Sequence, residues 1–321
     1  HQATQAPMTA TIDRSERVRN KIAVRRMLRD RKGIRPSSDY RPHTGGQEQF
    51  HASVHNIRAL FPGNGWGKTI ALGCEIDHWC RHTSRWQPTP PWPLICLWFG
   101  KSQDQLDLQR QSLARHCFGP LVRYKESDDR FVWEDGSFLQ MGLASTASDW
   151  QRWQGIAADL IAFDEQPTLG LYREMQMRRR GERDTRYILA ATATEGITWM
   201  YAEIAKPWLE FHQGLGLDED AAMREQRHPS IFCWTKGGID DNPGATEEQR
   251  RHYHSRTWSS EKERKVRLFG GFESWVGDPV FDEKAVEGFR ADLDGLDEKH
   301  GRPRRGFFQA VFPLQASKAG A

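Results

Sequence analysis

Short apolar runs alternate with amphipathic stretches between Ile57 and about Trp234, and this pattern predicts the fold. Four runs, rich in β-branched and aromatic residues, have the length of buried strands. They cover 56–61, 93–99, 159–163 and 186–192. Helical patterns begin at Lys68 and cover 103–117. Strands that alternate with helices form parallel sheets covered on both faces. We therefore expect an α/β fold of three layers with a mostly parallel central sheet.

The rest of the chain divides around this core. Residues 130–143 predict a β-hairpin, because Asp135-Gly136 is a turn dipeptide between two β-rich arms. Residues after about 236 are polar and helical, which predicts a small helical lid or linker subdomain. The expected domains are a basic N-terminal extension (1–45), the core (46–235) and the lid/linker subdomain (236–321).

The N-terminal extension is strongly basic. Residues 14–35 contain ten Lys or Arg residues, although the net charge of the whole chain is only +3. Residues 14–32 predict a helix with one apolar side. That side consists of Ile22, Val24, Met27 and Leu28. The helix either packs on the core with a solvated face or contacts nucleic acid or a partner, and the sequence favours neither.

Composition excludes several classes of protein. With 37% hydrophobic and 28% charged residues, the chain is globular rather than disordered. No apolar run approaches the roughly 20 residues of a membrane span. The first ten residues lack the basic-then-apolar pattern of a signal peptide. We therefore expect a protein that is neither a membrane protein nor secreted.

The cysteines leave two interpretations open. Cys74 and Cys80 lie near His78 and His82, which are residues of the type that bind zinc. Zinc sites usually have tighter spacing than this C-x5-C pair. Reduced thiols of a cytoplasmic protein are the alternative that we favour.

Residues 61–69, Phe-Pro-Gly-Asn-Gly-Trp-Gly-Lys-Thr, follow a predicted strand and open a predicted helix. This context is typical of a phosphate loop, or Walker A motif. Its glycines let backbone N–H groups face phosphate oxygens, and the helix N-terminus adds partial positive charge. The expected nucleotide-binding residues are Gly63, Asn64, Gly65, Trp66, Gly67, Lys68 and Thr69. Pro62 departs from the usual motif, which has glycine there. The motif predicts a P-loop NTPase fold that is RecA/ASCE-like.

The chemistry expected of this loop lies in its last two residues. Lys68 has the position to reach the β- and γ-phosphates of ATP, and the Thr69 hydroxyl has the position to bind Mg²⁺.

The apolar run that ends in Asp164-Glu165 predicts a Walker B motif. A carboxylate at a strand end lies at the sheet edge where ligands bind. Asp164 is expected to hold Mg²⁺, together with Thr69, and Glu165 is expected to be the general base that activates water. An Asp-Glu pair after apolar residues also begins many surface loops, but the phosphate loop upstream favours the catalytic interpretation.

From roughly 43 to 285 the chain resembles bacteriophage large terminase subunits, the ATPases of DNA-packaging motors. Gln47-Glu48-Gln49-Phe50-His51 is similar to the family's Gln-x-x-Phe-His segment. Residues 154–167 are similar to the stretch around the family's acidic strand. Residues 192–201 resemble its coupling motif, and 241–243 and 270–281 also resemble family segments.

The resemblance implies further roles. Gln47 would read the adenine edge, and Thr192 and Thr194 would couple hydrolysis to movement. Two positions depart from the family pattern: Gly65 stands where many members have a catalytic arginine, and Glu195 stands where proline is common. Arg152, 12 positions before Asp164, is our candidate for the missing arginine, acting in a neighbouring subunit. The alternative is a cation–π contact of Arg152 with the tryptophans on either side.

The resemblance also implies partners and a location. The cofactors are ATP and Mg²⁺, and the motor translocates double-stranded DNA, without sequence preference, into a preformed capsid. The partners would be a portal protein and a small terminase subunit. We expect a homo-oligomeric ring on the capsid and monomers in isolation. The expected location is the host cytoplasm, and transiently the procapsid portal vertex.

The family's C-terminal nuclease domain is not expected in this chain. About 40 residues follow Phe281, and the carboxylates after residue 290 resemble a solvated charge run. We therefore expect the ATPase portion of a longer protein, or a protein that works with a separate nuclease.

Two other functions remain alternatives. A superfamily 2-like helicase needs a second lobe with an arginine motif, which the residues after Thr194 do not contain. A nucleotide-binding structural protein with weak hydrolysis is compatible with Gly65 and Pro62.

Overall fold

The computed structural model describes residues 19–24, 36–43, 45–119, 121–144, 151, 153–178, 185–194 and 198–272. The chain divides into two compact units, His1–Glu273 and Ser274–Ala321, and all described residues belong to the first. The boundary expected near residue 236 stays a prediction.

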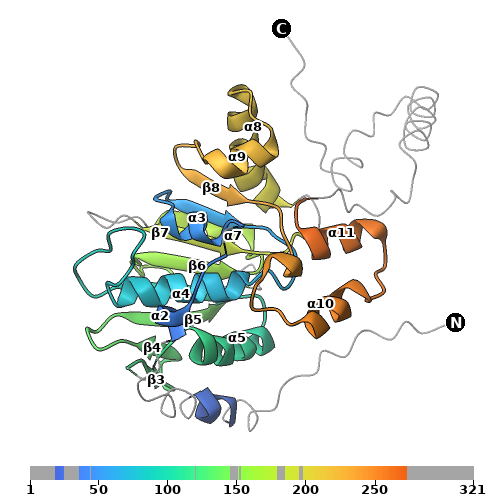
Figure 1. Cartoon of the computed structure of the whole chain (residues 1–321). Helices are drawn as coiled ribbons and strands as arrows, with labels where there is room; N and C mark the ends of the chain where they lie inside the picture. Colours follow the sequence, from blue (N-terminus) through green and yellow to red (C-terminus); the bar gives the residue numbers. More distant parts are fainter. Residues whose placement is uncertain are drawn as a thin grey trace, which may run out of the picture. The chain divides into compact units, whose positions relative to one another are not determined.

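A sheet of eight strands forms the centre of this unit (Figure 1). The strands are β1 (Ile57–Leu60), β2 (Ile95–Gly100), β3 (Arg123–Lys125), β4 (Arg130–Val132), β5 (Phe138–Leu143), β6 (Leu160–Asp164), β7 (Arg186–Ala190) and β8 (Ile231–Trp234). Their order is β3-β4-β5-β2-β6-β7-β1-β8. All pairs are parallel except β3–β4 and β4–β5. The four predicted strands are confirmed as β1, β2, β6 and β7; β3 and β8 were not predicted individually.

The register of the central strands brings their carboxyl ends to one level. Asp164 at the end of β6 pairs with Gly100 of β2 and with Ala190 of β7. Ala190 in turn pairs with Leu60 of β1. The residues that follow β1, β6 and β7 therefore emerge side by side at one edge of the sheet, where α/β proteins bind ligands.

Helices cover both faces of the sheet. On one face, α3 (Gln47–Ala52), α4 (Lys68–Cys80) and α5 (Gln103–His116) enclose a core that includes Trp98 and Ile188. On the other face, α7 (Leu169–Gln176), η1 (Tyr201–Ala205), α8 (Lys206–Gly214) and α9 (Glu219–Glu225) enclose a core that includes Phe99 and Phe163. Adjacent residues of one strand enter opposite cores, as the pleat requires. The predicted three-layer architecture is confirmed.

The predicted hairpin is also confirmed. The strands β4 and β5 are antiparallel, with Val132 opposite Phe138. The Trp133 N–H donates to the Ser137 carbonyl over 2.8 Å, which closes the turn. Gly136 has a φ of +91°, a conformation that glycine adopts without strain.

Two segments flank the core. Residues 19–24 are helical, with Val24 buried and Ile22 42% exposed; Met27 and Leu28 lie outside the described residues. The short helix α2 (Pro36–Asp39) follows. After β8, the chain forms η2 (Ile239–Asp241), α10 (Glu247–His254) and α11 (Glu261–Phe269), drawn in orange in Figure 1. The assignment of these helices to a separate lid/linker subdomain stays a prediction.

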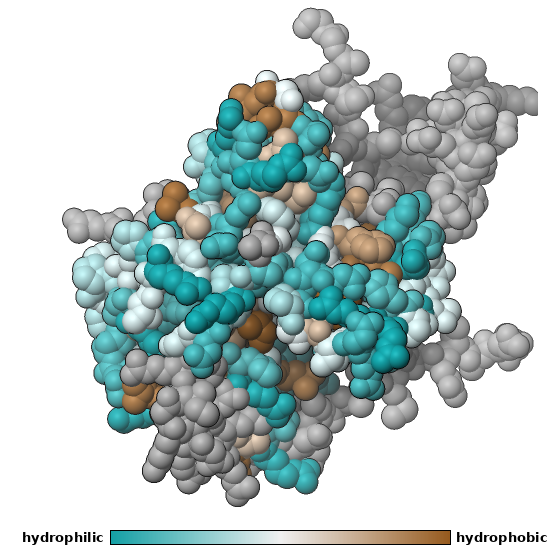
Figure 2. Space-filling view, in the orientation of Figure 1, coloured by the Kyte–Doolittle hydropathy of each residue, from teal (hydrophilic) through white to brown (hydrophobic). Residues whose placement is uncertain are grey.

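The visible surface is mostly hydrophilic, with small, separate apolar patches (Figure 2). In the part of the chain that the structure describes, no helix combines the length and the apolar character that a membrane span requires.

Candidate nucleotide-binding site

The predicted phosphate loop connects β1 to α4. Gly65 and Gly67 have φ values of +77° and +96°, in the left-handed region that favours glycine. Lys68 is the first residue of α4, so its side chain turns back over the loop. The sequence requires this local fold because two glycines permit the reversal and the helix begins directly behind them.

The Lys68 ammonium group is buried inside the loop. Its Nζ donates to the carbonyls of Pro62 (2.6 Å) and Gly63 (2.8 Å) and to the Thr192 hydroxyl (2.9 Å). Burial lowers the pKa of Lys68 to about 8, although the charges of Glu165 and Asp164 oppose this shift. A buried cation held by neutral carbonyls is able to exchange them for phosphate oxygens, which would stabilise its charge.

Thr69 meets the acidic strand end. Its hydroxyl lies 3.1 and 3.0 Å from the two carboxylate oxygens of Asp164. Gln109 of α5 donates to the same carboxylate from Nε2 over 2.6 Å, and its Oε1 accepts from the Trp98 indole over 2.9 Å. Because an indole N–H only donates, this contact fixes the orientation of the amide. The sequence did not single out Gln109, since a glutamine in a polar helix carries no signal of its own.

The carboxylates of Asp164 and Glu165 create a buried excess of negative charge. Burial raises the pKa of Asp164 to about 7, and the neighbouring Glu165 adds to the rise. Burial also raises the pKa of Glu165, against the positive charge of Lys68. A divalent cation beside Asp164 and Thr69 would relieve this excess, and both residues offer the oxygen ligands that Mg²⁺ prefers.

The backbone of Glu165 adopts an uncommon conformation. Its φ is +82°, which is rare for a residue with a side chain, and its N–H donates to the Ala190 carbonyl over 2.7 Å. Strained backbone of this kind is concentrated at functional sites. The charge of Lys68 acts on Glu165, so the two side chains lie near each other; the role of Glu165 as a general base stays a prediction.

The predicted coupling residues follow β7. The Thr192 hydroxyl accepts from Lys68 and donates to Oδ1 of Asn64 over 2.9 Å. The Thr194 N–H donates to the Thr192 carbonyl over 2.7 Å. Thr192 therefore links the end of β7 to the phosphate loop directly, and Thr194 contacts Thr192 through the backbone.

Gln47 and Trp66 contact each other rather than open space. Nε2 of Gln47 donates to the Trp66 carbonyl over 3.0 Å, and only 4% of Gln47 is exposed. The Trp66 indole is fully buried and packs edge-on against His43. The Trp66 side chain therefore packs in the core and holds the loop there. Only the backbone of Trp66 is placed to contact a nucleotide.

The segment after β8 braces the loop from the other side. Asn242 donates from Nδ2 to the Gly65 carbonyl over 2.7 Å. The Asn64 N–H donates to the Arg267 carbonyl over 2.6 Å, and the Gly63 N–H donates to the Gly237 carbonyl over 2.8 Å. Asn242 belongs to one of the segments that resemble terminases, but its contact with the loop was not predicted.

The position of the missing loop arginine is closed. A Cβ on Gly65 would lie 2.9 Å from the Cβ of Ile239. Other arginines of the core are engaged elsewhere: Arg110 pairs with Asp107 and Asp129, Arg130 pairs with Asp128, and Arg173 pairs with Glu203. Arg152 lies outside the described residues.

The cysteines do not gather around a metal. All five are buried and free, and the Sγ atoms of Cys80 and Cys96 are 3.6 Å apart. Among the residues that the structure describes, no group of three or more His, Cys, Asp or Glu side chains is arranged to hold a metal ion.

The order of the strands and the position of the two motifs identify the fold as that of a P-loop nucleoside triphosphatase. The phosphate loop follows β1, the acidic pair ends β6, and β7 lies between these strands. No family model matches the sequence, and no curated protein matches it significantly.

Solved structures identify the fold more closely. The large terminase of a thermophilic bacteriophage matches with a TM-score of 0.51 and 13% identity, over 76% of this chain and 57% of that chain. The large terminase ATPase domain of Thermus phage P74-26 matches with a TM-score of 0.50 and 16% identity, over 73% of this chain and 98% of that chain. The chain thus matches little more than half of the first protein but nearly all of the Thermus phage domain. It has the fold of a large terminase ATPase domain.

Proposed function

We propose that this chain is the ATPase of a viral DNA-packaging motor, which couples ATP hydrolysis to movement of double-stranded DNA. The observation that carries the proposal is the meeting of Lys68, Thr69, Asp164 and Glu165 at one sheet edge of a terminase ATPase fold. The other members of the motor would be a portal protein, a small terminase subunit and further copies of this chain in a ring.

In the proposed mechanism, Lys68 leaves the loop carbonyls to bind the β- and γ-phosphates of ATP. Thr69 and Asp164 would hold Mg²⁺, which neutralises phosphate charge when bound. Glu165 accepts a proton from the attacking water, and burial raises its pKa, which makes it a stronger base. Loss of the γ-phosphate changes the partners of Lys68, and Thr192 would pass that change to β7.

The first prediction tests this assignment through phosphate release. Lys68→Ala should abolish ATP turnover because it removes the phosphate clamp. Glu165→Gln should bind ATP and hydrolyse it at least about 100-fold more slowly, since an amide cannot accept the proton. Lys206→Ala is the matched control, because Lys206 is an exposed lysine of α8 that pairs with Glu210. Normal turnover in either site variant would contradict the assignment.

The same assay with double-stranded DNA separates the motor from its main alternative. A nucleotide-binding structural protein with weak hydrolysis is favoured by one observation, the closed position at Gly65 where a catalytic arginine would stand. A motor should release phosphate faster when double-stranded DNA of any sequence is added. Slow turnover that DNA leaves unchanged would support the structural protein instead.

A further inference from the structure

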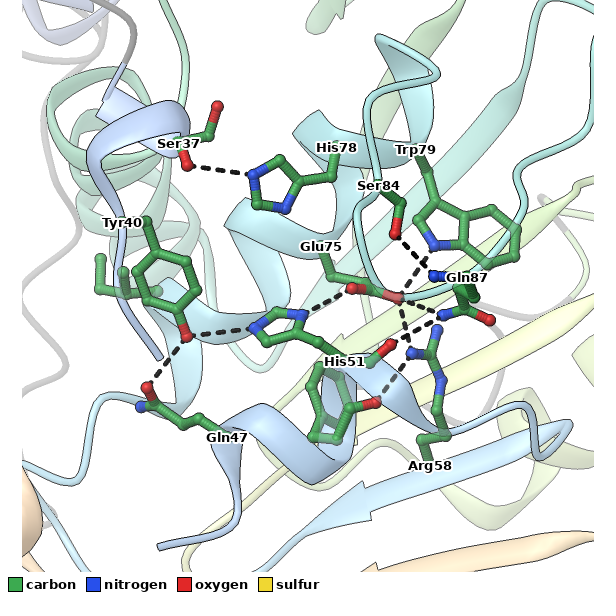
Figure 3. A network of polar contacts seen from close by, with 12 residues as sticks. Ser37, Tyr40, Gln47, His51, Arg58, Glu75, His78, Trp79, Ser84 and Gln87 are labelled. Carbon is green, nitrogen blue, oxygen red and sulfur yellow. Dashed lines mark hydrogen bonds and ion pairs between the residues drawn. The ribbon is translucent and has the colours of Figure 1, made fainter. Parts of the chain in front are cut away.

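A chain of polar contacts connects Glu75 in the core to Gln47 (Figure 3), and Gln47 contacts the phosphate loop. His51 contacts Glu75 through Nδ1 (2.6 Å) and the Tyr40 hydroxyl through Nε2 (3.1 Å). The Tyr40 hydroxyl also lies 2.9 Å from Oε1 of Gln47, and Gln47 donates to the Trp66 carbonyl. These contacts connect α4, α3 and the segment after α2 to a single peptide of the loop.

The inner end of this chain is a rigid anchor. Glu75 accepts from Arg58 (2.6 Å), Trp79 (2.9 Å) and Gln87 (3.1 Å), and Arg58 and Glu75 are fully buried. Burial raises the pKa of Glu75, but the Arg58 charge and the contact with His51 outweigh this effect and lower it to about 2. The Glu75 carboxylate is therefore ionised and accepts a hydrogen bond from Nδ1 of His51. Burial lowers the pKa of His51, so its Nε2 carries a lone pair, and the single Tyr40 proton is available either to this nitrogen or to Oε1 of Gln47.

The outer end fixes the orientation of the Gln47 amide. A carbonyl oxygen only accepts, so the Gln47 atom that faces Trp66 must be the nitrogen. The oxygen of the amide then faces the Tyr40 hydroxyl, with the His43 N–H 3.3 Å away. Oε1 of Gln47 is thus engaged by other residues of the contact series, and little of the Gln47 side chain is exposed. This arrangement does not suit a residue that presents a donor and an acceptor to a base.

The contact with Trp66 determines where the next peptide N–H points. The described residues contain no cis peptide, and in a trans peptide the C=O and the N–H point in opposite directions. Gln47 holds the Trp66 carbonyl, and the Gly67 N–H of the same peptide therefore points away from Gln47. The Asn242 contact with the Gly65 carbonyl holds the preceding peptide in the same manner. Backbone N–H groups of this loop are the groups that cradle phosphate.

We infer that Gln47, held by Tyr40, His51 and Glu75, is a positioning residue that orients the phosphate loop for the triphosphate and does not read the base. The inference rests on the proposed nucleotide site, because an oriented loop matters only if the loop binds phosphate. It predicts that loss of Gln47 weakens the binding of every triphosphate by the same factor, whatever base is attached.

The test compares ATP, GTP and inorganic triphosphate, each with Mg²⁺, by calorimetry. Gln47→Met keeps the length of the side chain but has no donor, and Tyr40→Phe removes only the hydroxyl behind Gln47. Both variants should bind all three ligands about three- to tenfold more weakly, the effect of one or two lost hydrogen bonds. Tyr124→Phe is the matched control, since it removes a buried hydroxyl from β3 at the far edge of the sheet.

Two results would overturn the inference. Weakened binding of ATP alone would mean that Gln47 reads adenine, and unchanged binding of all three ligands would mean that it does not position the loop. Thermal unfolding of each variant shows that the comparison is made on folded protein. A wild-type chain that binds none of the ligands would instead contradict the proposed function itself.

Discussion

At the scale of single residues, Asp164 depends on a neighbour that holds it in place. Gln109 donates to the Asp164 carboxylate and is itself oriented by Trp98. Groups that hydrogen-bond to metal ligands typically change metal affinity by about 10- to 100-fold when they are removed. Gln109 therefore matters to the proposed Mg²⁺ site although it would not touch the metal.

A second prediction follows for Gln109→Ala. The Mg²⁺ concentration for half-maximal ATP hydrolysis should rise about tenfold, while the rate at saturating Mg²⁺ should stay within a few-fold of wild type. Gln111→Ala, the same change in the same helix at a half-exposed position, is the control. An unchanged Mg²⁺ requirement in Gln109→Ala would show that Asp164 needs no such support.

A third prediction concerns Gly65. Gly65→Ala should lower the free energy of unfolding by about 1–3 kcal/mol, because the residue has a positive φ and its Cβ would meet Ile239. Gly214→Ala is the control, since a Cβ at that helical position meets nothing within 4 Å. Urea unfolding measures both variants. Equal stability of Gly65→Ala and wild type would mean that the loop accepts a side chain there.

At the scale of elements, the buried pair of Arg58 and Glu75 joins β1 to α4. Arg58 is stacked over the Phe50 ring of α3 at 4.9 Å, and it pairs with Glu75 over 2.6 Å. The strand before the loop and the helix after it are thereby tied together below the site. Loss of one partner from a buried ion pair leaves the other charge without compensation.

The fourth prediction is the pH dependence of this pair. The pKa of Glu75 is about 2 in the folded chain and 4.5 ordinarily, so its ionised form stabilises the fold above pH 4.5. Glu75→Gln should lower the free energy of unfolding by about 3 kcal/mol at pH 7. The difference from wild type should shrink as the pH falls from 4.5 to about 2. Urea unfolding at several pH values tests this, with the exposed Glu248→Gln as control. A difference that does not change with pH would contradict the assigned charge.

The elements that the sequence predicted are those with strong local signals. The strands β1, β2, β6 and β7 lie in short, largely apolar runs. The glycine loop and the turn at Gly136 depend on backbone freedom that the residue type reveals. The edge strand β3 has charged residues at two of its three positions. The strand β8 is an apolar run, but four residues are too few to assign a strand by pattern alone.

The site was predictable where one segment carries its own chemistry, as in residues 63–69 and in Asp164-Glu165. Gln109 and Asn242 could not be predicted, because each gains its role only when the fold brings it to the loop. Gln47 was placed at the nucleotide site by its segment, but only its contacts with Tyr40 and Trp66 indicate how it acts. Which polar side chain meets which carbonyl is decided by tertiary structure.

At the scale of the whole molecule, the segment after β8 and the core build one site together. Asn242, which directly follows η2, and the backbone of Arg267 in α11 both form hydrogen bonds with the phosphate loop. An ATPase that moves DNA must convert hydrolysis into displacement of one part against another. In the proposed motor, hydrolysis would move other parts of the molecule through these contacts and through the Thr192 contact with Lys68.

The fifth prediction concerns the catalytic arginine, which the phosphate loop at residues 61–69 does not contain. Negative charge gathers on the γ-phosphate oxygens during phosphoryl transfer, and an arginine placed there increases the rate by about 10³-fold or more. The loop position at Gly65 is closed by Ile239. Arg110, Arg130 and Arg173, the other arginines considered for the role, all make ion pairs with carboxylates.

Arg152 remains our candidate. Its neighbour Trp153 is buried and packs against Phe99 of β2. If Arg152 acts in a neighbouring subunit, Arg152→Ala and Glu165→Gln should each be inactive alone and regain DNA-stimulated ATPase activity when mixed. Some interfaces of the mixed ring would pair an intact Arg152 with an intact Glu165, whereas an arginine that acts within its own subunit permits no such recovery. The phosphate-release assay over a series of mixing ratios measures this, and a maximum at intermediate ratios is expected. Near-normal turnover by Arg152→Ala alone would remove Arg152 from the site altogether.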